Sequence, residues 1–326
     1  MVSPSHLASI LFPAPPRAIE TLIARGLCLC VVLGTLIRYL GRWNWLCEIT
    51  THFVVQATVL ASIATLLLLV RRHWRLCAVA AILTLVNAAE WVPYYSLQSL
   101  TSQAYKADET LIVVSTNVYS RNRNSADLHQ WLSDTQADVV FVSEVDGWWA
   151  KQLDSWKAEW PHQILEPRQD NFGLALLSRF PIKSSQVFDL DGAIPAVEAR
   201  IETPSGEWSI VGLHPLPPSG PNNSRLRNQQ LATAAQHISA LAKPRVVLGD
   251  FNSTSSSPVF RDFLQATGLT DSRYGRGWQP TWPARSRLLR IPIDHCLVEP
   301  SLRVIDRSVG PKIGSDHLPL RARLSR

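Results

Sequence analysis

Three apolar runs dominate the first part of the chain. Residues 22–40, 49–70 and 76–94 are rich in Leu, Val, Ala and Ile, and each run is flanked by Arg or Trp. A helix needs about 20 apolar residues to cross the hydrocarbon core of a bilayer. We therefore predict a membrane anchor of three transmembrane helices over residues 21–95, after an N-terminal tail of residues 1–20. Buried helices of a soluble protein are the alternative, and a cleaved signal peptide accounts for the first run alone.

The pattern changes beyond residues 96–109, which we predict to be a linker. Short runs rich in β-branched residues alternate from there with helical patterns at 125–135 and 224–242. Mixed strands and helices over residues 110–326 predict a layered α/β domain. The predicted strands are 111–118, 138–145, 174–177, 197–201, 208–213, 245–248, 293–298 and 318–324.

The arginines of the anchor predict its orientation. Arg17 and the arginines within residues 71–75 lie on one side of the predicted spans, whereas Arg38 and Arg42 lie on the other. By the positive-inside rule the first side faces the cytoplasm. Three crossings then place the α/β domain outside the cytoplasm.

Net charge weakens the case for a nucleic-acid-binding surface. Residues 1–105 carry +4 of the formal charge of +6, which leaves +2 for the rest of the chain. A broad surface for nucleic acid normally has a strong basic excess. A local basic groove, for example around Arg121 and Arg123, stays open.

The sequence Gly249-Asp250-Phe251-Asn252 follows the apolar run 245–248 and precedes a Ser-rich turn. This pattern is typical of a buried strand that ends at an exposed edge. Residues two apart on an extended chain point to the same face, so Asp250 and Asn252 present a carboxylate and an amide side by side. That pair suits a hard cation and a phosphate, and a strand-capping turn is the alternative.

Further polar side chains accumulate next to the other apolar runs. They are Asn117, Glu144, His214, Asp294, Asp316 and His317. Singly, each has a structural explanation, such as a solvated loop or a capping residue. Together they supply hard oxygen ligands, two imidazoles and carboxylates to orient them. Metal-assisted hydrolysis of a phosphoester requires this set of groups.

Six motifs carry a resemblance to a known superfamily. They are Ser115-Thr116-Asn117-Val118, Ser143-Glu144, Gly212-Leu213-His214-Pro215, Gly249-Asp250-Phe251-Asn252, Ile293-Asp294-His295 and Gly314-Ser315-Asp316-His317. In order and local context they resemble the endonuclease/exonuclease/phosphatase superfamily over about residues 110–324. The resemblance implies a four-layer α/β fold, in which two facing β-sheets are flanked by helices and the site lies at one rim of the sandwich.

The resemblance also implies a metal cofactor. Glu144 would hold Mg²⁺ or Mn²⁺, helped by Asn117 and Asp316. Magnesium prefers oxygen ligands and keeps several waters, so one or two protein carboxylates are enough.

The remaining motif residues would form the catalytic set. By the same resemblance, Asp250 and Asn252 would align the attacking water and the phosphate. His317, oriented by Asp294, and His214 would share phosphate binding and proton transfer. Histidine suits both tasks because it titrates near neutral pH.

Two further segments point to one branch of this superfamily. Together with the anchor, His214-Pro215-Leu216-Pro217-Pro218 and Gln279-Pro280-Thr281-Trp282-Pro283 resemble a bacterial membrane-bound branch that includes extracytoplasmic phosphatases linked to glycopeptide resistance. We therefore expect a multi-pass protein of the bacterial inner (plasma) membrane. It would hydrolyse a phosphate ester or pyrophosphate near the membrane surface, and a polyprenyl pyrophosphate is the candidate lipid-linked substrate.

The substrate prediction names three arginines. Arg225, Arg287 and Arg290 would neutralise a pyrophosphate or a lipid head group, and solvated loop charges are the alternative. Superfamily membership fixes the bond type better than the substrate. An extracytoplasmic endonuclease or exonuclease acting on DNA or RNA therefore remains open, as does an inactive membrane module that binds a lipid or a protein.

Overall fold

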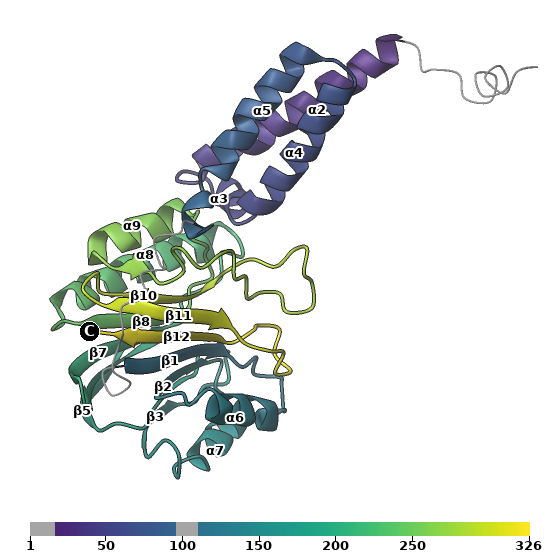
Figure 1. Cartoon of the computed structure of the whole chain (residues 1–326). Coiled ribbons are helices and arrows are strands. Elements are labelled where there is room, and N and C mark those ends of the chain that lie inside the picture. The colour runs from purple at the N-terminus through teal and green to yellow at the C-terminus, as the bar shows by residue number, and fades with distance from the viewer. Residues whose placement is uncertain (1–16, 96–109) are drawn as a thin grey trace, which may run out of the picture.

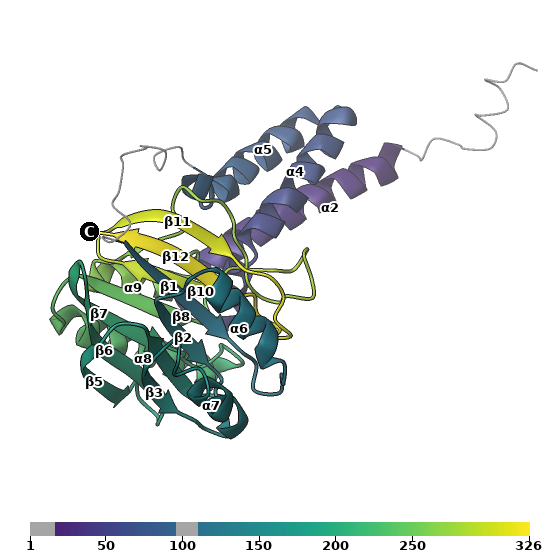
Figure 2. The ribbon, with the colours of Figure 1, turned by 60° about the horizontal axis from the view of Figure 1, so that its bottom comes forward.

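The computed structural model of the chain describes residues 17–95 and 110–326. The predicted linker and most of the predicted tail lie outside the described residues. The described part consists of an N-terminal helical unit and an α/β sandwich. The helical unit projects from one side of the sandwich in both ribbon views (Figures 1 and 2).

The helical unit is built from three longer helices and three short ones within the described residues. They are α2 (Arg17–Leu36), the 3-10 helix η1 (Ile37–Leu40), α3 (Trp45–Thr51), α4 (Val54–Val70), α5 (Trp74–Ala88) and the 3-10 helix η2 (Val92–Tyr95). The side chain of Asn44 caps α3, because its oxygen accepts hydrogen bonds from the backbone N–H groups of Leu46 and Cys47. Small and apolar side chains pack α2, α4 and α5 against one another.

The prediction of three helices of spanning length is not met. Among the described residues, only Ala18–Leu40 is a single helical segment long and apolar enough to cross a membrane. α3 and α4 pass the same test only as a pair, and they are bent by 72° where α3 gives way to α4. α5 has 15 residues, which is short of the predicted run 76–94. The apolar pattern did not reveal the bend, because a break in a helix does not require a change in hydropathy.

Two mixed six-stranded sheets form the sandwich. The first has the order β11-β12-β1-β2-β4-β3 and the second has the order β5-β6-β7-β8-β10-β9. The pairs β1–β2 and β7–β8 are parallel, and the other neighbours are antiparallel. The strands are β1 (Thr110–Asn117), β2 (Val139–Ser143), β3 (His162–Glu166), β4 (Leu174–Ser178), β5 (Ile182–Asp189), β6 (Pro195–Thr203), β7 (Gly206–Leu213), β8 (Arg245–Asp250), β9 (Thr270–Asp271), β10 (Asp294–Val298), β11 (Arg303–Val309) and β12 (Leu320–Ser325).

Helices cover the outer face of each sheet. They are α6 (Ser125–Asp134) and α7 (Gly147–Asp154) on the first sheet, and α8 (Pro221–Ala240) and α9 (Pro258–Thr267) on the second. Side chains such as Phe141 and Trp208 fill the space between the sheets. The predicted four-layer sandwich is therefore confirmed, and α8 and α9 lie on the side nearer the helical unit (Figure 1).

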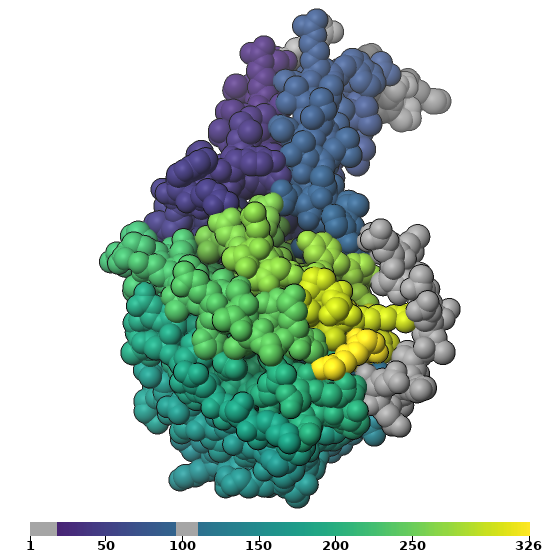
Figure 3. All heavy atoms as spheres, turned by 90° about the vertical axis from the view of Figure 1, so that its left-hand side faces the viewer, coloured from purple at the N-terminus to yellow at the C-terminus, as the bar shows by residue number. Residues whose placement is uncertain are grey.

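A buried ion pair joins the helical unit to the sandwich. The Glu48 carboxylate on α3 is 2% exposed and lies 2.6 Å from the guanidinium of Arg227 on α8, which is fully buried. The Ser257 hydroxyl donates to the same carboxylate at 2.7 Å. In the space-filling view the helical unit is seated on the sandwich beside the green surface of α8 and α9 (Figure 3). These contacts fix α3 relative to the second sheet.

We predict that Glu48→Gln destabilises the whole chain, because it leaves the buried Arg227 charge without its counter-ion. The expected loss is about 3–5 kcal/mol in the free energy of unfolding. Denaturant titration of the full chain in detergent, followed by tryptophan fluorescence, measures it. The matched control is Arg42→Gln, because the Arg42–Asp262 pair is about half exposed and its loss should cost less than about 1 kcal/mol. Equal stability losses in the two variants would contradict this account of the junction.

Candidate active site

Polar side chains from both sheets meet where the parallel strands end. In the first sheet, Asn117 ends β1 and Glu144 directly follows β2. In the second sheet, His214 follows β7 and Asp250 ends β8. β10 runs antiparallel to β8 and begins with Asp294 directly opposite Asp250. Parallel pairing thus brings residues that are far apart in sequence to one rim of the sandwich.

Gly249 allows β7 and β8 to approach closely just before the site. A Cβ atom at this position would lie only 1.9 Å from the backbone oxygen of Leu213. Only glycine fits this spacing without moving one of the strands. The glycine therefore sets the position of Asp250, the next residue.

Asp250 is the group through which the two sheets are connected at this rim. Its Oδ2 accepts a hydrogen bond from the Asn117 amide at 3.2 Å, and its Oδ1 accepts one from the backbone N–H of Asn252 at 2.8 Å. The Nε2 atoms of His214 and His317 each lie 3.6 Å from Oδ2. The side chain is only 2% exposed, and a buried carboxylate needs such partners.

Asn117 also connects Asp250 to Glu144. The same amide nitrogen donates to Glu144 Oε1 at 2.9 Å, and the backbone N–H of Ser120 donates to Glu144 Oε2 at 3.2 Å. Glu144 has a φ of 62°, which is uncommon for a residue other than glycine. The carboxylate is therefore held in place by its surroundings. The Asn117 oxygen already accepts the N–H of Tyr119, so its second lone pair is what remains for a cation.

The donor set fits a hard divalent cation. Asp250 and Asp294 offer carboxylate oxygens within 4.8 Å of each other and of His317, and the carboxylates of Glu144 and Asp316 line the same pocket as Asp250. One oxygen of Asp294 and one of Asp316 are buried without a hydrogen-bond partner among the described residues. Unpaired buried carboxylate oxygens need a positive partner, and carboxylate and carbonyl oxygens are the ligands that Mg²⁺ and Mn²⁺ prefer.

His317 is charged over a wide pH range in this arrangement. Its Nδ1 lies 2.9 Å from Asp294 Oδ2. Burial by itself would lower the pKa of His317, but the charges of Asp294 and Asp250 outweigh burial and raise the pKa to about 10. The charged imidazole therefore stabilises the metal-free fold fully below its unfolded pKa of about 6.5. That contribution is lost as the pH rises through the folded value.

The structure brings the predicted acids, amides and imidazoles together. They line a pocket of about 470 Å³ or lie directly behind it. Lining residues among them are Glu144, His214, Asp250, Asn252, Asp316 and His317, while Asn117 and Asp294 support them through hydrogen bonds. Asp316 Oδ2 accepts the indole N–H of Trp282 at 3.1 Å. The individual roles stay predictions.

None of the three predicted substrate arginines is among the residues that line this pocket, although Arg290 directly precedes the lining residue Ile291. Arg225 and Arg287 are exposed, and the Arg290 guanidinium donates to the backbone oxygens of Pro283 and Ala284. Their contact with a substrate remains a prediction that this geometry does not support.

Other residues of the pocket were not assigned from the sequence. Residues 170–172 contribute from the loop before β4, and Ile49, His52 and Phe53 contribute from the helical unit. The first group could have been predicted, because the polar pair Asp170-Asn171 shortly precedes a buried strand, as the other site residues lie next to buried strands. No local pattern indicates the second group, because its position depends on how the helical unit packs.

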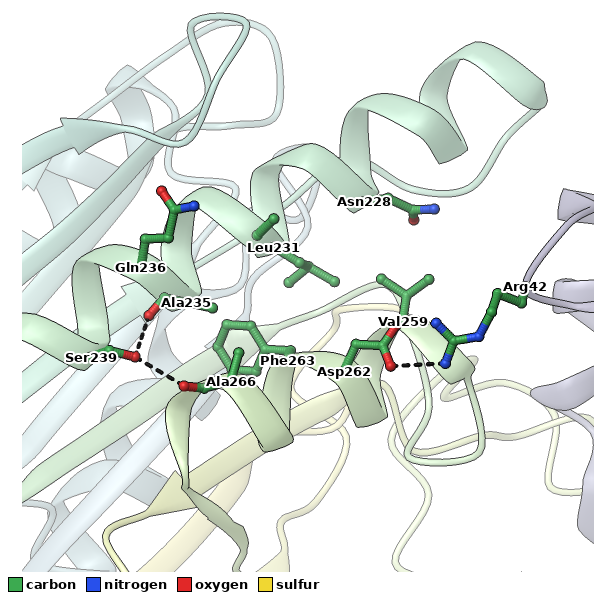
Figure 4. Close-up of a pocket in the computed structure, with 11 residues that line it drawn as sticks. Arg42, Asn228, Leu231, Ala235, Gln236, Ser239, Val259, Asp262, Phe263 and Ala266 are labelled. Carbon is green, nitrogen blue, oxygen red and sulfur yellow. Dashed lines mark hydrogen bonds and ion pairs between the residues drawn. The ribbon is translucent and has the colours of Figure 1, made fainter.

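A second cavity, of about 530 Å³, lies between α8 and α9 (Figure 4). Leu231 and Ala235 on α8 face Val259 and Phe263 on α9 there. Its charged lining residues, Arg42 and Asp262, pair with each other at 2.7 Å. Its lining residues include no imidazole and no cluster of acids, so the chemistry of a phosphoesterase is concentrated in the first pocket.

The comparison with protein families gives one match over residues 114–317, to the "Endonuclease/Exonuclease/phosphatase family". The matched segment covers more than half of the chain and runs from β1 to His317. The chain belongs to this family. Members of the endonuclease/exonuclease/phosphatase family are hydrolases that act on phosphoesters and depend on divalent metal ions. No curated protein matches the chain in a sequence search.

Solved structures support the family fold. A humanized TDP2 from D. rerio aligns with a TM-score of 0.56 and 15% identity, over 67% of this chain and 100% of the TDP2 chain. An endonuclease/exonuclease/phosphatase from Beutenbergia cavernae aligns with a TM-score of 0.55 and 18% identity, over 67% of this chain and 72% of that one. An endonuclease/exonuclease/phosphatase from Bacteroides vulgatus aligns with a TM-score of 0.54 and 20% identity, over 66% of this chain and 98% of that one. Identities this low support the likeness of fold alone.

We predict that Asp294→Asn lowers the pKa of His317 from about 10, because burial is then less strongly opposed by negative charge. A histidine NMR titration of the metal-free full chain in detergent measures the midpoint. Asp316→Asn is the matched control and should give the smaller fall, since Asp316 contributes less to the raised pKa than Asp294 does. An unmoved midpoint in Asp294→Asn would show that Asp294 does not support the charge of His317.

We also predict that Glu144→Ala weakens Mn²⁺ binding at least about tenfold, because the variant removes a carboxylate from the proposed metal site. Electron paramagnetic resonance of free and bound Mn²⁺ measures the affinity. Glu166→Ala, which changes an exposed carboxylate at the end of β3, is the control and should bind as the wild type does. Unchanged Mn²⁺ affinity in Glu144→Ala would remove Glu144 from the metal site.

Proposed function

We propose that the chain is a membrane-anchored, Mg²⁺- or Mn²⁺-dependent phosphoesterase that hydrolyses a phosphate ester or pyrophosphate near the membrane surface. A polyprenyl pyrophosphate is the leading candidate substrate. The observation that carries the proposal is the acid–imidazole cluster of Asp250, Asp294 and His317, whose ligand atoms lie within 4.8 Å of one another inside the segment that matches the family.

The residues of the cluster suit water attack on a phosphoryl group. Asp250 lies between His214 and His317 and is held by the backbone N–H of Asn252, so it is placed to accept the proton of the attacking water. His317, held by Asp294, donates from Nε2 to a phosphoryl oxygen. Because a pKa of about 10 makes it a weak acid at neutral pH, His317 acts through its charge, and His214 protonates the leaving oxygen.

Glu144, with Asn117 and Asp316, would hold the divalent cation. When bound, the cation draws negative charge from the phosphoryl oxygens and stabilises the leaving oxygen. The unpaired Asp316 oxygen and the double hydrogen bond from Asn117 support this assignment.

Exposed apolar side chains support the membrane anchor. Leu22 on α2, Leu60 and Val70 on α4, and Leu85 on α5 are each 67–70% exposed. Such a surface is unfavourable in water and favourable in lipid. We propose a multi-pass anchor in which the arginines of residues 71–75, at the end of α4 away from the sandwich, face the cytoplasm. The catalytic domain then lies on the extracytoplasmic side of a bacterial inner membrane.

A nuclease is the second candidate. The observation that favours it is the likeness in fold to D. rerio TDP2, whose structure was solved with a single-strand DNA product. A phosphodiester would use the same acids and imidazoles. The charge of the catalytic part argues against it, because +2 over residues 106–326 is small for a nucleic-acid-binding protein.

The test is product formation by the detergent-solubilised full chain with Mg²⁺ or Mn²⁺. We expect phosphate release from a polyprenyl pyrophosphate, no cleavage of single- or double-stranded DNA, and a loss of turnover of at least about 100-fold in His317→Ala. Circular dichroism should show His317→Ala to be folded.

His129→Ala, which changes a partly exposed imidazole on α6, is the matched control and should keep full activity. If the protein cleaves DNA and does not hydrolyse the pyrophosphate, the substrate is a nucleic acid and the lipid substrate is ruled out. Near-normal activity of His317→Ala would overturn the mechanism itself.

A further inference from the structure

One wall of the active-site pocket comes from outside the catalytic domain. Ile49 on α3, together with His52 and Phe53 in the bend between α3 and α4, lines the same pocket as Asp250 and His317. The family match begins at residue 114, so these residues are not part of the matched segment. The helical unit therefore completes the pocket as well as projecting from the sandwich.

Polar contacts hold this bend against the catalytic domain along its length. Before the bend, Glu48 pairs with Arg227 in the buried junction. Within it, His52 Nδ1 lies 3.2 Å from the Thr254 hydroxyl. After it, the Gln56 amide donates to the backbone oxygens of Leu288 and Arg290 at 3.1 and 3.3 Å. Contacts on both sides of Ile49 and Phe53 fix their positions in the pocket wall.

Apart from the buried His52, the side chains of this wall are apolar. Ile49 and Phe53 share the pocket with the apolar residues Ile291 and Ile293 and with Trp282, and the acids, His214 and His317 line the same pocket. The pocket thus has both charged and apolar lining residues, which suits a ligand that is charged at one end and apolar at the other.

The apolar character continues from this wall toward the proposed membrane. α4 begins directly after Phe53 and is apolar along most of its length. The loop that Gln56 contacts carries Leu288 and Leu289, which are 84% and 57% exposed. Apolar side chains therefore follow Phe53 along α4 and are exposed on the loop that Gln56 contacts.

We propose that Ile49 and Phe53 bind the hydrocarbon portion next to the phosphate of an amphiphilic substrate, and so make the enzyme selective for phosphates that carry a long apolar chain. This inference rests on the proposed phosphoesterase function. The helical unit then provides residues that determine specificity, and the catalytic domain provides the acids and imidazoles that act on the phosphate.

The experiment compares two diphosphates that differ only in chain length. The full-length protein in detergent is assayed with farnesyl diphosphate and dimethylallyl diphosphate, and kcat/KM is measured for each. Phe53→Ala should lower kcat/KM for farnesyl diphosphate about tenfold or more, because burial of an aromatic side chain against the substrate is lost. Its kcat/KM for dimethylallyl diphosphate should change less than about twofold. Ile49→Ala should show the same selectivity to a smaller degree.

Two further variants separate a pocket effect from a general one. Leu60→Ala removes an exposed apolar side chain of α4 that does not line the pocket, and it should leave the ratio of the two kcat/KM values unchanged. Phe53→Leu keeps an apolar side chain, so it should retain most of the selectivity. It also serves as the test variant if Phe53→Ala does not fold.

The outcomes distinguish the two proposals. If the wild type hydrolyses both diphosphates but Phe53→Ala and Ile49→Ala lower both kcat/KM values equally, or change neither, the inference is wrong and the phosphoesterase function stands. If the wild type hydrolyses neither diphosphate and cleaves DNA, the proposed function fails and the inference fails with it.

Discussion

The candidate site depends on keeping one carboxylate charged where water is largely excluded. Asp250 is nearly buried at the end of a central strand, and an isolated charge there would be strongly unfavourable. Asn117 from the opposite sheet, the backbone of Asn252 and two imidazoles compensate it. The two sheets must therefore meet in one relative position for the charge to be tolerated, and the same constraint assembles the catalytic groups.

Much of the fold could be predicted from the sequence because buried strands leave a clear pattern. The predicted central strands all exist, but β3, β5, β9 and β11 were missed. Each of these four strands lies at the edge of its sheet. An edge strand has fewer buried positions, and β5, with mostly exposed side chains, lacks the apolar run on which the prediction relied.

The acids and imidazoles of the site could also be predicted, because the order of the motifs along the chain can be recognised without knowing any distance between them. Substrate contacts could not be predicted in the same way. Arg287 is predicted to bind substrate because it is a charged residue close to Asp294 in sequence, yet it is exposed and does not line the pocket. The apolar pattern predicts Phe53 only as part of a membrane span, yet Phe53 lines the site. The position of Phe53 depends on how the helical unit packs against the sandwich, and no local sequence pattern predicts that packing.

The location of a bound cation is the most direct test of the account. Crystals of the full chain soaked in Mn²⁺ can be measured at a wavelength where manganese scatters anomalously. We predict an anomalous peak at the rim where β1, β2 and β8 end, within about 2.0–2.6 Å of a Glu144 oxygen. A fully folded protein with no peak at this rim, or with manganese bound only elsewhere, would show that these residues do not form a metal-dependent phosphoesterase site.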